Sequence, residues 1–288
     1  MRASTRLREL MAGDEVIVAP GTYDGLTARL VEQAGFPAIY VSGGAMARSL
    51  GIPDMGLMTP SDISARLTQI VDAAPKTPII ADMDTGYGNA LNARTTVRAF
   101  ERAGVAGFHI EDQTFPKRCG HYEDKSIVPA GELVQKIKAI RDASTDPDLV
   151  IVARTDAIAV EGLDGAIERM HRYMEAGADV AFVEAPTSEA QIEEISRRLP
   201  YPKLINMFWG GKTPLMSAAQ LKALGYKIVI IPSDMQRAAI RGMQDVLQAI
   251  KAEGHSASMA ERMVSFKDRE AIIGTADWME IDRRYAAE

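Results

Sequence analysis

The segment GVAGFHIEDQTFPKRCGH, residues 104–121, joins an apolar run to a polar loop that is dense in reactive side chains. Its apolar part, Val105 to Ile110, predicts a buried strand, because short continuous apolar runs bounded by glycine are typical of such strands. Glu111 follows where that strand would end, and the loop after it carries Lys117, Arg118, Cys119 and His121. The segment therefore predicts a strand whose carboxyl end carries functional groups.

The helix end before this strand, Ala103-Gly104, has counterparts along the chain. Ala34-Gly35, Ala176-Gly177 and Leu224-Gly225 each precede an apolar run in the same way. Glycine commonly takes the left-handed position just after a helix. Each pair therefore predicts that a helix ends and a strand begins.

Eight apolar runs predict strands, and they lie at Glu15 to Pro20, Ala38 to Gly43, Pro78 to Asp84, Val105 to Glu111, Leu149 to Asp156, Asp179 to Ala185, Lys203 to Phe208 and Lys227 to Pro232. Amphipathic segments between and after them predict helices near Asp24 to Ala34, Pro60 to Ala73, Ala90 to Ala103, Gly131 to Ala143, Leu163 to Ala176, Glu189 to Leu199, Ala218 to Leu224 and Met235 to Glu253. Strands built from Val, Ile and Ala are typical of a parallel sheet that is covered on both faces.

The eight strand-helix units predict a single closed (β/α)8 TIM barrel over residues 1–255. An open doubly wound sheet is the alternative, but no G-x-G-x-x-G follows the first strand. Residues 256–288 predict a further helical extension, helical from Ser256 to about Tyr285. Its apolar side chains would pack either on its own barrel or on a neighbouring subunit, and they are Met259, Met263, Phe266, Ile272 and Trp278.

Composition narrows the class of protein. The 288 residues carry a net charge of -6. The sequence has no basic stripe with interleaved aromatic residues, so we expect no nucleic-acid partner. No stretch reaches the roughly 20 apolar residues that span a bilayer, and the N-terminus lacks the apolar core of a signal peptide. We therefore expect a cytoplasmic enzyme without a membrane partner. The single cysteine excludes an intramolecular disulfide and multi-cysteine zinc sites, so a metal would have oxygen ligands.

Acidic side chains gather where two neighbouring strands end. Alternation along the third strand would place Asp82 and Asp84 on one face, and Glu111 ends the next strand. Adjacent carboxylates repel each other unless a cation or a proton lies between them. Oxygen ligands favour Mg2+, with Mn2+ as the alternative. The competing interpretation is a pair of solvated loop acids.

The lone thiol, Cys119, lies between cationic residues. Nearby positive charge favours the thiolate, so the sequence predicts a proton donor or nucleophile. A small buried apolar residue is the alternative. At other strand ends, Ser42, Gly43 and Gly44 could present backbone amides to an anion or form a plain tight turn. Arg154 could bind a substrate carboxylate with two hydrogen bonds, and it could also pair with Glu184.

KRCGH preceded by HIEDQ resembles the signature loop of the isocitrate lyase and phosphoenolpyruvate mutase superfamily. The loop is most similar to the branch with methylisocitrate lyase and dimethylmalate lyase, and the similarity runs from about Leu10 to about Pro232. It implies Mg2+-dependent cleavage of a 2-hydroxy di- or tricarboxylic acid into an α-keto acid and a second carboxylic acid. It also implies a homotetramer, built from dimers that exchange a C-terminal helix.

The resemblance also implies roles for particular residues. Asp84 would touch the metal, Asp82 and Glu111 would act largely through water, and Asp54 would lie nearby. The keto-acid carboxylate would lie on Ser42, Gly43 and Gly44. The substrate and the anion formed from it would be bound or stabilised by Lys117, Arg118, Gly120, His121, Arg154, Glu184, Asn206 and Thr213, with Cys119 supplying the proton.

This sequence departs from the family in the loop after the seventh strand. The family pattern N-x-x-E-G-G-K-T-P has Trp209 at its acidic position here. A tryptophan removes a charge and adds apolar bulk, so the pocket would favour a more apolar or smaller substituent if Trp209 faces it. The alternative is that Trp209 packs elsewhere.

The loop bearing Cys119 would act as a lid.

Two further functional interpretations stay open. KRCGH also occurs in carboxyphosphonoenolpyruvate mutase-like proteins, so a phosphonate reaction, or hydrolysis or decarboxylation of oxaloacetate, is the enzymatic alternative. A metabolite-binding barrel without turnover is the non-enzymatic one.

Overall fold

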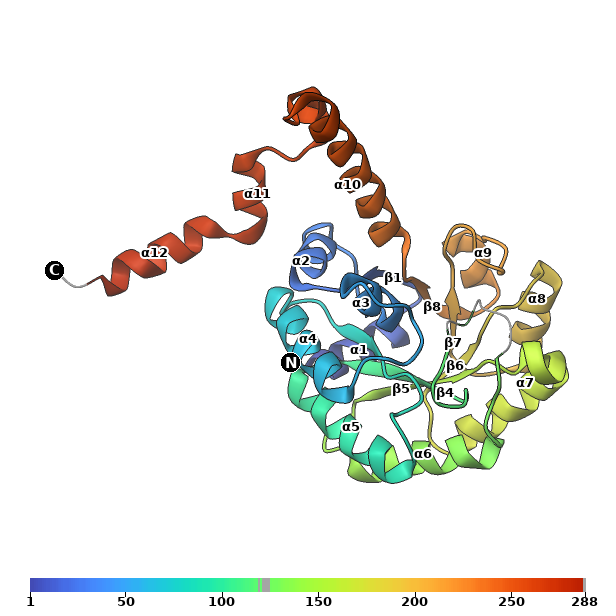
Figure 1. The fold of residues 1–288 in the computed structure, drawn as a ribbon. Helices are drawn as coiled ribbons and strands as arrows, with labels where there is room; N and C mark the ends of the chain where they lie inside the picture. The colour runs from blue at the N-terminus through green and yellow to red at the C-terminus, as the bar shows by residue number, and fades with distance from the viewer. Residues whose placement is uncertain (119, 121–124, 287–288) are drawn as a thin grey trace. The chain divides into compact units, whose positions relative to one another are not determined.

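The computed structural model describes residues 1–118, 120 and 125–286 of the chain. The chain divides into two compact units, Met1–Asp234 and Met235–Glu288. Figure 1 shows the first unit as a ring of helices around central strands. The predicted boundary at residue 255 stays a prediction.

Parallel strands form a closed barrel in the first unit. Their order around the barrel follows the chain, and β1 closes it by pairing with β8. The strands are β1 (Ile17–Thr22), β2 (Ile39–Val41), β3 (Ile79–Asp82), β4 (Gly107–Glu111), β5 (Val150–Thr155), β6 (Val180–Val183), β7 (Lys203–Asn206) and β8 (Tyr226–Ile231). The predicted TIM barrel is confirmed.

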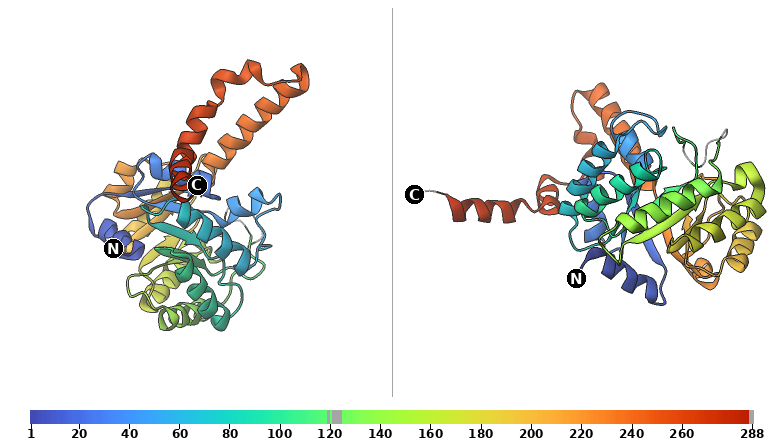
Figure 2. Two further views of the ribbon diagram at one scale, coloured as in Figure 1. Left: turned by 90° about the vertical axis from the view of Figure 1, so that its left-hand side faces the viewer. Right: turned by 90° about the horizontal axis from the view of Figure 1, so that it is seen from below.

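Helices cover the outside of the barrel, as the further views of Figure 2 also show. Those that follow the strands in this unit are α2 (Gly25–Gln33), α3 (Gly43–Ser49), α4 (Pro60–Ala73), α5 (Ala90–Ala103), α6 (Ala130–Ala143), α7 (Ile158–Glu175), α8 (Glu189–Arg198) and α9 (Ala218–Ala223). Local sequence fixes several of their ends. Thr59 and Asp62 form a capping box at the start of α4, and Gly104 ends α5 with a left-handed φ of 90°.

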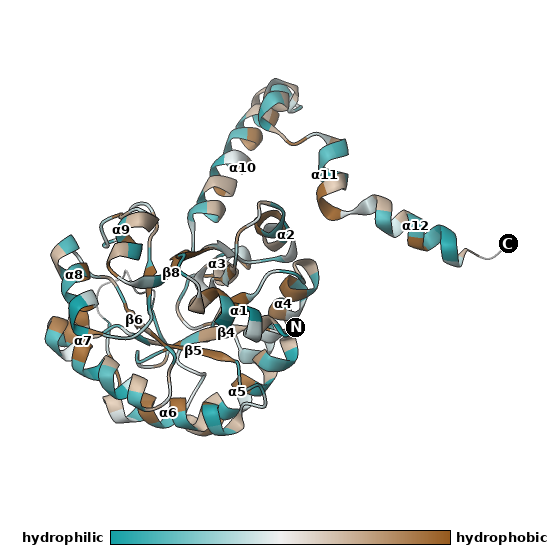
Figure 3. Cartoon of the chain, turned by 180° about the vertical axis from the view of Figure 1, so that it is seen from behind, coloured by the Kyte–Doolittle hydropathy of each residue, from teal (hydrophilic) through white to brown (hydrophobic). Residues whose placement is uncertain are grey.

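The barrel interior is apolar along the strands, where Figure 3 shows hydrophobic residues on β5 and β8. Ile17, Val150 and Ile228 belong to one buried cluster, and Leu7 of α1 joins it. The helix α1 (Ala3–Ala12) was not predicted; only Ser4 and Leu7 among its residues are fully buried. It contributes Leu7 to the barrel core.

The second unit contains α10 (Asp234–Glu253), the 3-10 helix η1 (Ala257–Arg262), α11 (Phe266–Ile273) and α12 (Thr275–Tyr285). The continuous helix predicted from Ser256 is divided twice here. Met263 is extended after η1, and Gly274 is left-handed with φ 74° between α11 and α12. Apolar side chains of α10 to α12 are exposed in the single chain, among them Leu247, Phe266 and Trp278. Within the described residues, no helix has the length and apolar character that crossing a membrane requires.

Candidate active site

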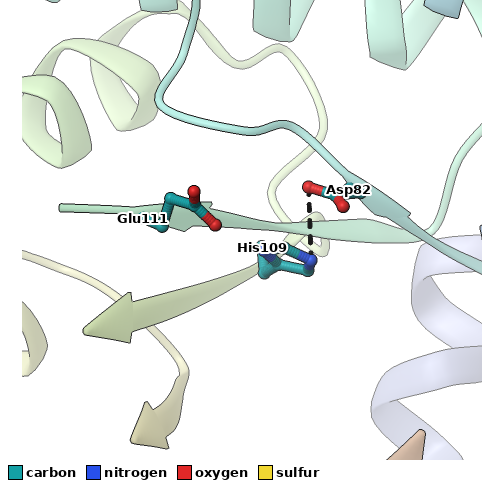
Figure 4. A group of neighbouring side chains, drawn as sticks. All are labelled: Asp82, His109 and Glu111. Atoms are coloured by element: carbon teal, nitrogen blue, oxygen red, sulfur yellow. Dashed lines mark ion pairs between the residues drawn. The ribbon is translucent and has the colours of Figure 1, made fainter. Parts of the chain in front are cut away.

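The ends of β3 and β4 bring acidic side chains together at the carboxyl end of the barrel. Strand register pairs Asp82 with His109, and Glu111 lies two residues further along β4 on the same face. Ligand atoms of Asp82, His109 and Glu111 lie within 4.8 Å of one another, and all three residues are buried (Figure 4). The predicted meeting of Asp82 and Glu111 is therefore present in the structure.

Asp84 reaches this region by a different route from the one expected. β3 ends at Asp82, and Asp84 has a left-handed φ of 47°, so strand alternation does not place it. A turn does so instead. The Asp84 amide donates to Asp82 Oδ1 at 3.0 Å, and the Glu111 amide donates to the Asp84 carbonyl at 3.0 Å. The alternation argument for Asp84 was wrong, while the residue is buried next to the cluster as predicted.

Lys117 connects Asp84 with Asp54. Its Nζ lies 2.7 Å from Asp54 Oδ1 and 2.9 Å from Asp84 Oδ1, and all three side chains are buried. Burial opposes the charge of Lys117, but Asp84, Asp82 and Asp54 raise its pKa well above the usual value. Asp54 lies in a bend of the chain, and its buried carboxylate belongs to the acidic cluster.

The cluster has more carboxylates than nearby cations to neutralise them. Burial raises the pKa of Asp84 to about 7, opposed by Lys117 and reinforced by Asp82 and Asp54. Burial also raises the pKa of Glu111 well above its usual range. Neither oxygen of Glu111 accepts a hydrogen bond from the described residues, although Arg154 lies 3.2 Å from Oε2. An added cation would relieve this arrangement.

His109 was missed from the sequence. Its Nε2 lies 2.8 Å from the Tyr40 hydroxyl and 3.4 Å from Asp82 Oδ1, and the imidazole is fully buried. Burial lowers the pKa of His109 to about 4, so the ring is neutral at pH 7. Alternation with Glu111 along the same strand was the signal that could have identified it. The neutral imidazole thus lies between the Tyr40 hydroxyl and Asp82.

Arg154 lies among acidic side chains. It makes two hydrogen bonds to Asp156, at 2.9 and 3.2 Å, and its Nε lies 3.9 Å from Glu184 Oε2. The expected pairing with Glu184 is thus present but long, and Asp156 is the nearer partner. Asn206 Nδ2 donates to Glu184 Oε1 at 3.4 Å, so Arg154, Glu184 and Asn206 form one group.

The predicted thiol loop is described only in part. Cys119 and His121 lie outside the described residues, as do residues 122–124 of the predicted lid. Gly120 is buried, and a side chain at this position would collide with Arg154 and Glu184. Lys125 donates to the Gly120 carbonyl at 2.6 Å and to Asp156 at 2.8 Å. The described part of the loop therefore reaches the group around Arg154.

Other predicted residues have distinct positions. The Gly43 amide donates to Asp82 Oδ2 at 3.1 Å, and the Ser42 hydroxyl accepts the Ala45 amide at the start of α3. A Cβ at Gly44 would meet the Asp54 carboxylate, so this glycine allows a close approach. The loop after β2 therefore packs against the acidic cluster.

The remaining three predicted contacts differ from one another in burial. Thr213 is buried and its hydroxyl has no hydrogen-bond partner among the described residues. Arg118 is exposed, while its amide is held by Gln113 at 2.9 Å. Trp209 is 67% exposed, so the single chain leaves it outside the buried cluster. The substrate contacts of all three residues stay predictions.

A buried network behind the site was also missed. Asp112 accepts hydrogen bonds from the Tyr173 hydroxyl at 2.8 Å, Thr155 Oγ1 at 2.7 Å and the Asp156 amide at 2.9 Å. Arg169 lies 3.4 Å from the same carboxylate. Asp112 therefore fixes the backbone of the residue that holds Arg154. A glutamate-aspartate pair at a strand end does not reveal which acid faces inward.

The donor set fits a divalent cation. Asp54, Asp82, Asp84 and Glu111 offer buried carboxylate oxygens, and the pKa of Asp84 is raised by burial and neighbouring acids. Hard cations such as Mg2+ prefer oxygen ligands, whereas imidazole also suits softer metals. These residues could hold such an ion at the carboxyl end of the barrel, where barrel enzymes place their active sites.

Comparisons with known proteins identify the family of the chain. The family model described as phosphoenolpyruvate phosphomutase matches residues 7–251. The chain is 42% identical to 2,3-dimethylmalate lyase of Eubacterium barkeri, over 99% of both chains. It is 41% identical to the chloroplastic carboxyvinyl-carboxyphosphonate phosphorylmutase of Arabidopsis thaliana, over 99% of this chain and 85% of that protein.

Solved structures extend the comparison to the fold. The structure of an oxaloacetate acetylhydrolase with the inhibitor 3,3-difluorooxalacetate is similar with a TM-score of 0.93 and 34% identity. The match covers 99% of this chain and 98% of that one. The chain belongs to the phosphoenolpyruvate mutase and isocitrate lyase superfamily of enzymes.

Proposed function

We propose that the protein is a Mg2+-dependent carbon-carbon lyase. Its substrate would be a 2-hydroxy di- or tricarboxylic acid similar to 2,3-dimethylmalate or 2-methylisocitrate, and its products an α-keto acid and a second carboxylic acid. The observation that carries the proposal is a set of buried carboxylates next to Arg154. They belong to Asp54, Asp82, Asp84 and Glu111. The 42% identity to a named 2,3-dimethylmalate lyase supports the same reaction.

Acidic residues at the carboxyl end of the barrel would hold the ion. Asp84 would contact the metal, Asp82 and Glu111 would act mainly through its water shell, and Asp54 would lie nearby. Mg2+ keeps several waters and binds few carboxylates directly. When bound, the ion would polarise the hydroxyl and carboxylate oxygens of the keto-acid half. Mn2+ is the alternative ion for the same oxygen ligands.

Cleavage would proceed with loss of the hydroxyl proton and breaking of the carbon-carbon bond. The electron pair of that bond moves to the departing acid as an enediolate. Arg154 and Lys117 are buried cations that would stabilise this negative charge. Arg118 and His121 would add to this positive charge on the thiol loop. Protonation by Cys119 would complete the second product.

The remaining predicted residues would bind the ends of the substrate. Ser42, Gly43 and Gly44 would lie against the keto-acid carboxylate. The other half would be contacted by Gly120, Glu184, Asn206, Thr213 and Trp209. The Gly120 position supports this division, because it adjoins both Arg154 and Glu184.

Product analysis tests the proposed reaction. Purified protein with Mg2+ would be incubated separately with dimethylmalate, methylisocitrate, oxaloacetate and a carboxyphosphonate. We expect an α-keto acid only from the 2-hydroxy acids. Oxalate and acetate from oxaloacetate would favour the hydrolase reaction, to which a solved relative with a TM-score of 0.93 points. Absence of any Mg2+-dependent product would favour a barrel that only binds a metabolite.

The same proposal includes a homo-oligomer, expected to be a tetramer of helix-exchanged dimers. Leu247, Phe266, Trp278 and Met279 expose 64, 72, 68 and 61% of their surface in the second unit. Large exposed apolar side chains gathered on one segment are typical of an interface. Light scattering at micromolar concentration would give a tetramer, and a monomer would contradict it. We also propose a cytoplasmic location, from the sequence features described above.

A further inference from the structure

The loop that follows β3 contains a buried hydroxyl that the mechanism does not use. Tyr87 is partly exposed as a residue, but its hydroxyl oxygen is buried. Within the described chain this oxygen has no hydrogen-bond partner. A buried polar group without a partner is costly, so native structures rarely keep one unless a bound molecule satisfies it.

The backbone holds Tyr87 in a restricted conformation. Its φ of 60° lies in the left-handed region, which large non-glycine residues rarely adopt. Anchors on the preceding residues fix the turn, since the Gly86 amide donates to Met83 at 3.0 Å and Lys136 donates to the Thr85 carbonyl at 3.2 Å. Such strained positions persist only where surrounding contacts hold them. The backbone of Tyr87 is therefore held in place before a ligand arrives.

Tyr87 belongs to the turn that carries Asp84, since it follows Asp84 by three residues and both have a left-handed φ. Burial raises the pKa of Tyr87 well above its usual value, and Asp84, Asp82 and Glu111 raise it further against the effect of Lys117. The group is therefore protonated and a hydrogen-bond donor at neutral pH. None of these carboxylates accepts its hydrogen bond. An acceptor from a bound molecule would complete the arrangement.

We propose that Tyr87 is a further substrate-binding residue, whose hydroxyl donates a hydrogen bond to the carboxylate of the keto-acid half. Hydrogen bonds to ionised acceptors are shorter and stronger than neutral ones. The assignment rests on the proposed function and adds a specific contact to it. A water bound to the metal is the competing acceptor.

The test compares the Tyr87→Phe variant with the wild type, using oxalate as the probe. Oxalate is a planar dianion whose oxygens match those of a keto acid in its enolate form. Calorimetry at saturating Mg2+ should give an oxalate Kd about tenfold higher in the variant, equivalent to about 1.4 kcal/mol. The Mg2+ Kd without oxalate should not change. The melting temperature should stay level or rise, because the variant removes a buried unpaired hydroxyl.

Tyr226→Phe serves as the matched control, since the Tyr226 hydroxyl is buried but donates to the Ile192 carbonyl at 3.3 Å. This variant should melt at a lower temperature and keep the wild-type oxalate Kd. An unchanged oxalate Kd in Tyr87→Phe overturns the proposal, and so does a weakened Mg2+ Kd with oxalate affinity intact. Failure of the wild type to bind oxalate also overturns it. The proposed reaction is judged separately, by turnover of 2-hydroxy acids.

Discussion

The ammonium group of Lys117 lies 2.9 Å from Asp84 Oδ1 in the buried acidic cluster, and the same group contacts Asp54 at 2.7 Å. A lysine thus neutralises part of the charge that we propose a divalent ion to share. This contact joins residues that are far apart in the chain. It links the thiol loop to the acids that we propose to bind the metal.

Replacing Lys117 should leave the negative charge of the acidic cluster uncompensated. Lys117→Met leaves Asp54 and Asp84 without their cation, and breaking a buried ion pair costs about 3–5 kcal/mol. The metal-free variant should therefore melt at a lower temperature than the wild type. Added Mg2+ should raise the melting temperature of the variant by more than that of the wild type, as thermal unfolding with EDTA or Mg2+ would measure.

A second buried lysine gives the control for this experiment. Lys203 donates to the Leu199 and Tyr201 carbonyls at 3.1 and 3.2 Å and lies at the start of β7, away from the strand ends that carry the site. Lys203→Met should lower the melting temperature and leave the Mg2+-induced shift at its wild-type size. Equal shifts in Lys117→Met and the wild type would contradict a shared cation site.

The network around Asp112 should contribute to both stability and activity. Tyr173→Phe removes a 2.8 Å hydrogen bond to the buried carboxylate, and hydrogen bonds to charged groups contribute about 1.5–3 kcal/mol. We expect the free energy of unfolding to fall by about 2 kcal/mol in denaturant titrations. Turnover should fall as well, because Asp112 also fixes the Asp156 amide.

Tyr201 offers a comparison for that variant, since its hydroxyl contacts His171 at 3.1 Å in a half-buried position. Tyr201→Phe should cost about 1 kcal/mol and leave kcat unchanged. If Tyr173→Phe cost no more than Tyr201→Phe and kept full kcat, the Asp112 network would have no positioning role.

The predicted proton donor can be tested by replacing its thiol. Cys119→Ser replaces the only thiol of the chain with a group that ionises far less readily. Turnover should fall by orders of magnitude, while the Kd values for Mg2+ and a keto acid stay near those of the wild type. Ala at the same position should give the same result. Wild-type turnover in both variants would remove Cys119 from the mechanism.

Much of the barrel was predictable because short stretches of sequence determine its strands and helix ends. Apolar runs identify the strands, and glycine after a helix marks the turn to the next strand, as at Gly104 with φ 90°. The helix α1 was not found because its contribution to the core depends mainly on one buried leucine, Leu7. The single C-terminal helix was wrong because the break at Gly274 was not recognised as a left-handed residue.

The site was predictable where chemistry and strand ends coincide, as at Asp82 and Glu111. What the sequence could not supply were contacts between distant residues. Lys117 meets Asp54 across 63 positions, and Tyr173 meets Asp112 across 61. Asp84 shows a further limit, because a left-handed turn rather than strand alternation carries it to the cluster. Tertiary packing determines such contacts, and it has no local signature.

The most direct test of the central claim is the stoichiometry of products with and without Asp84, the acid that we propose to contact the metal. Wild-type protein with Mg2+ and its 2-hydroxy acid should release an α-keto acid and a second carboxylic acid in a one-to-one ratio, and EDTA should stop the release. Asp84→Asn should lower that rate by about a hundredfold or more, with a weaker Mg2+ Kd. Full product release by Asp84→Asn, or by wild-type protein in EDTA, would contradict a metal-dependent lyase at this site.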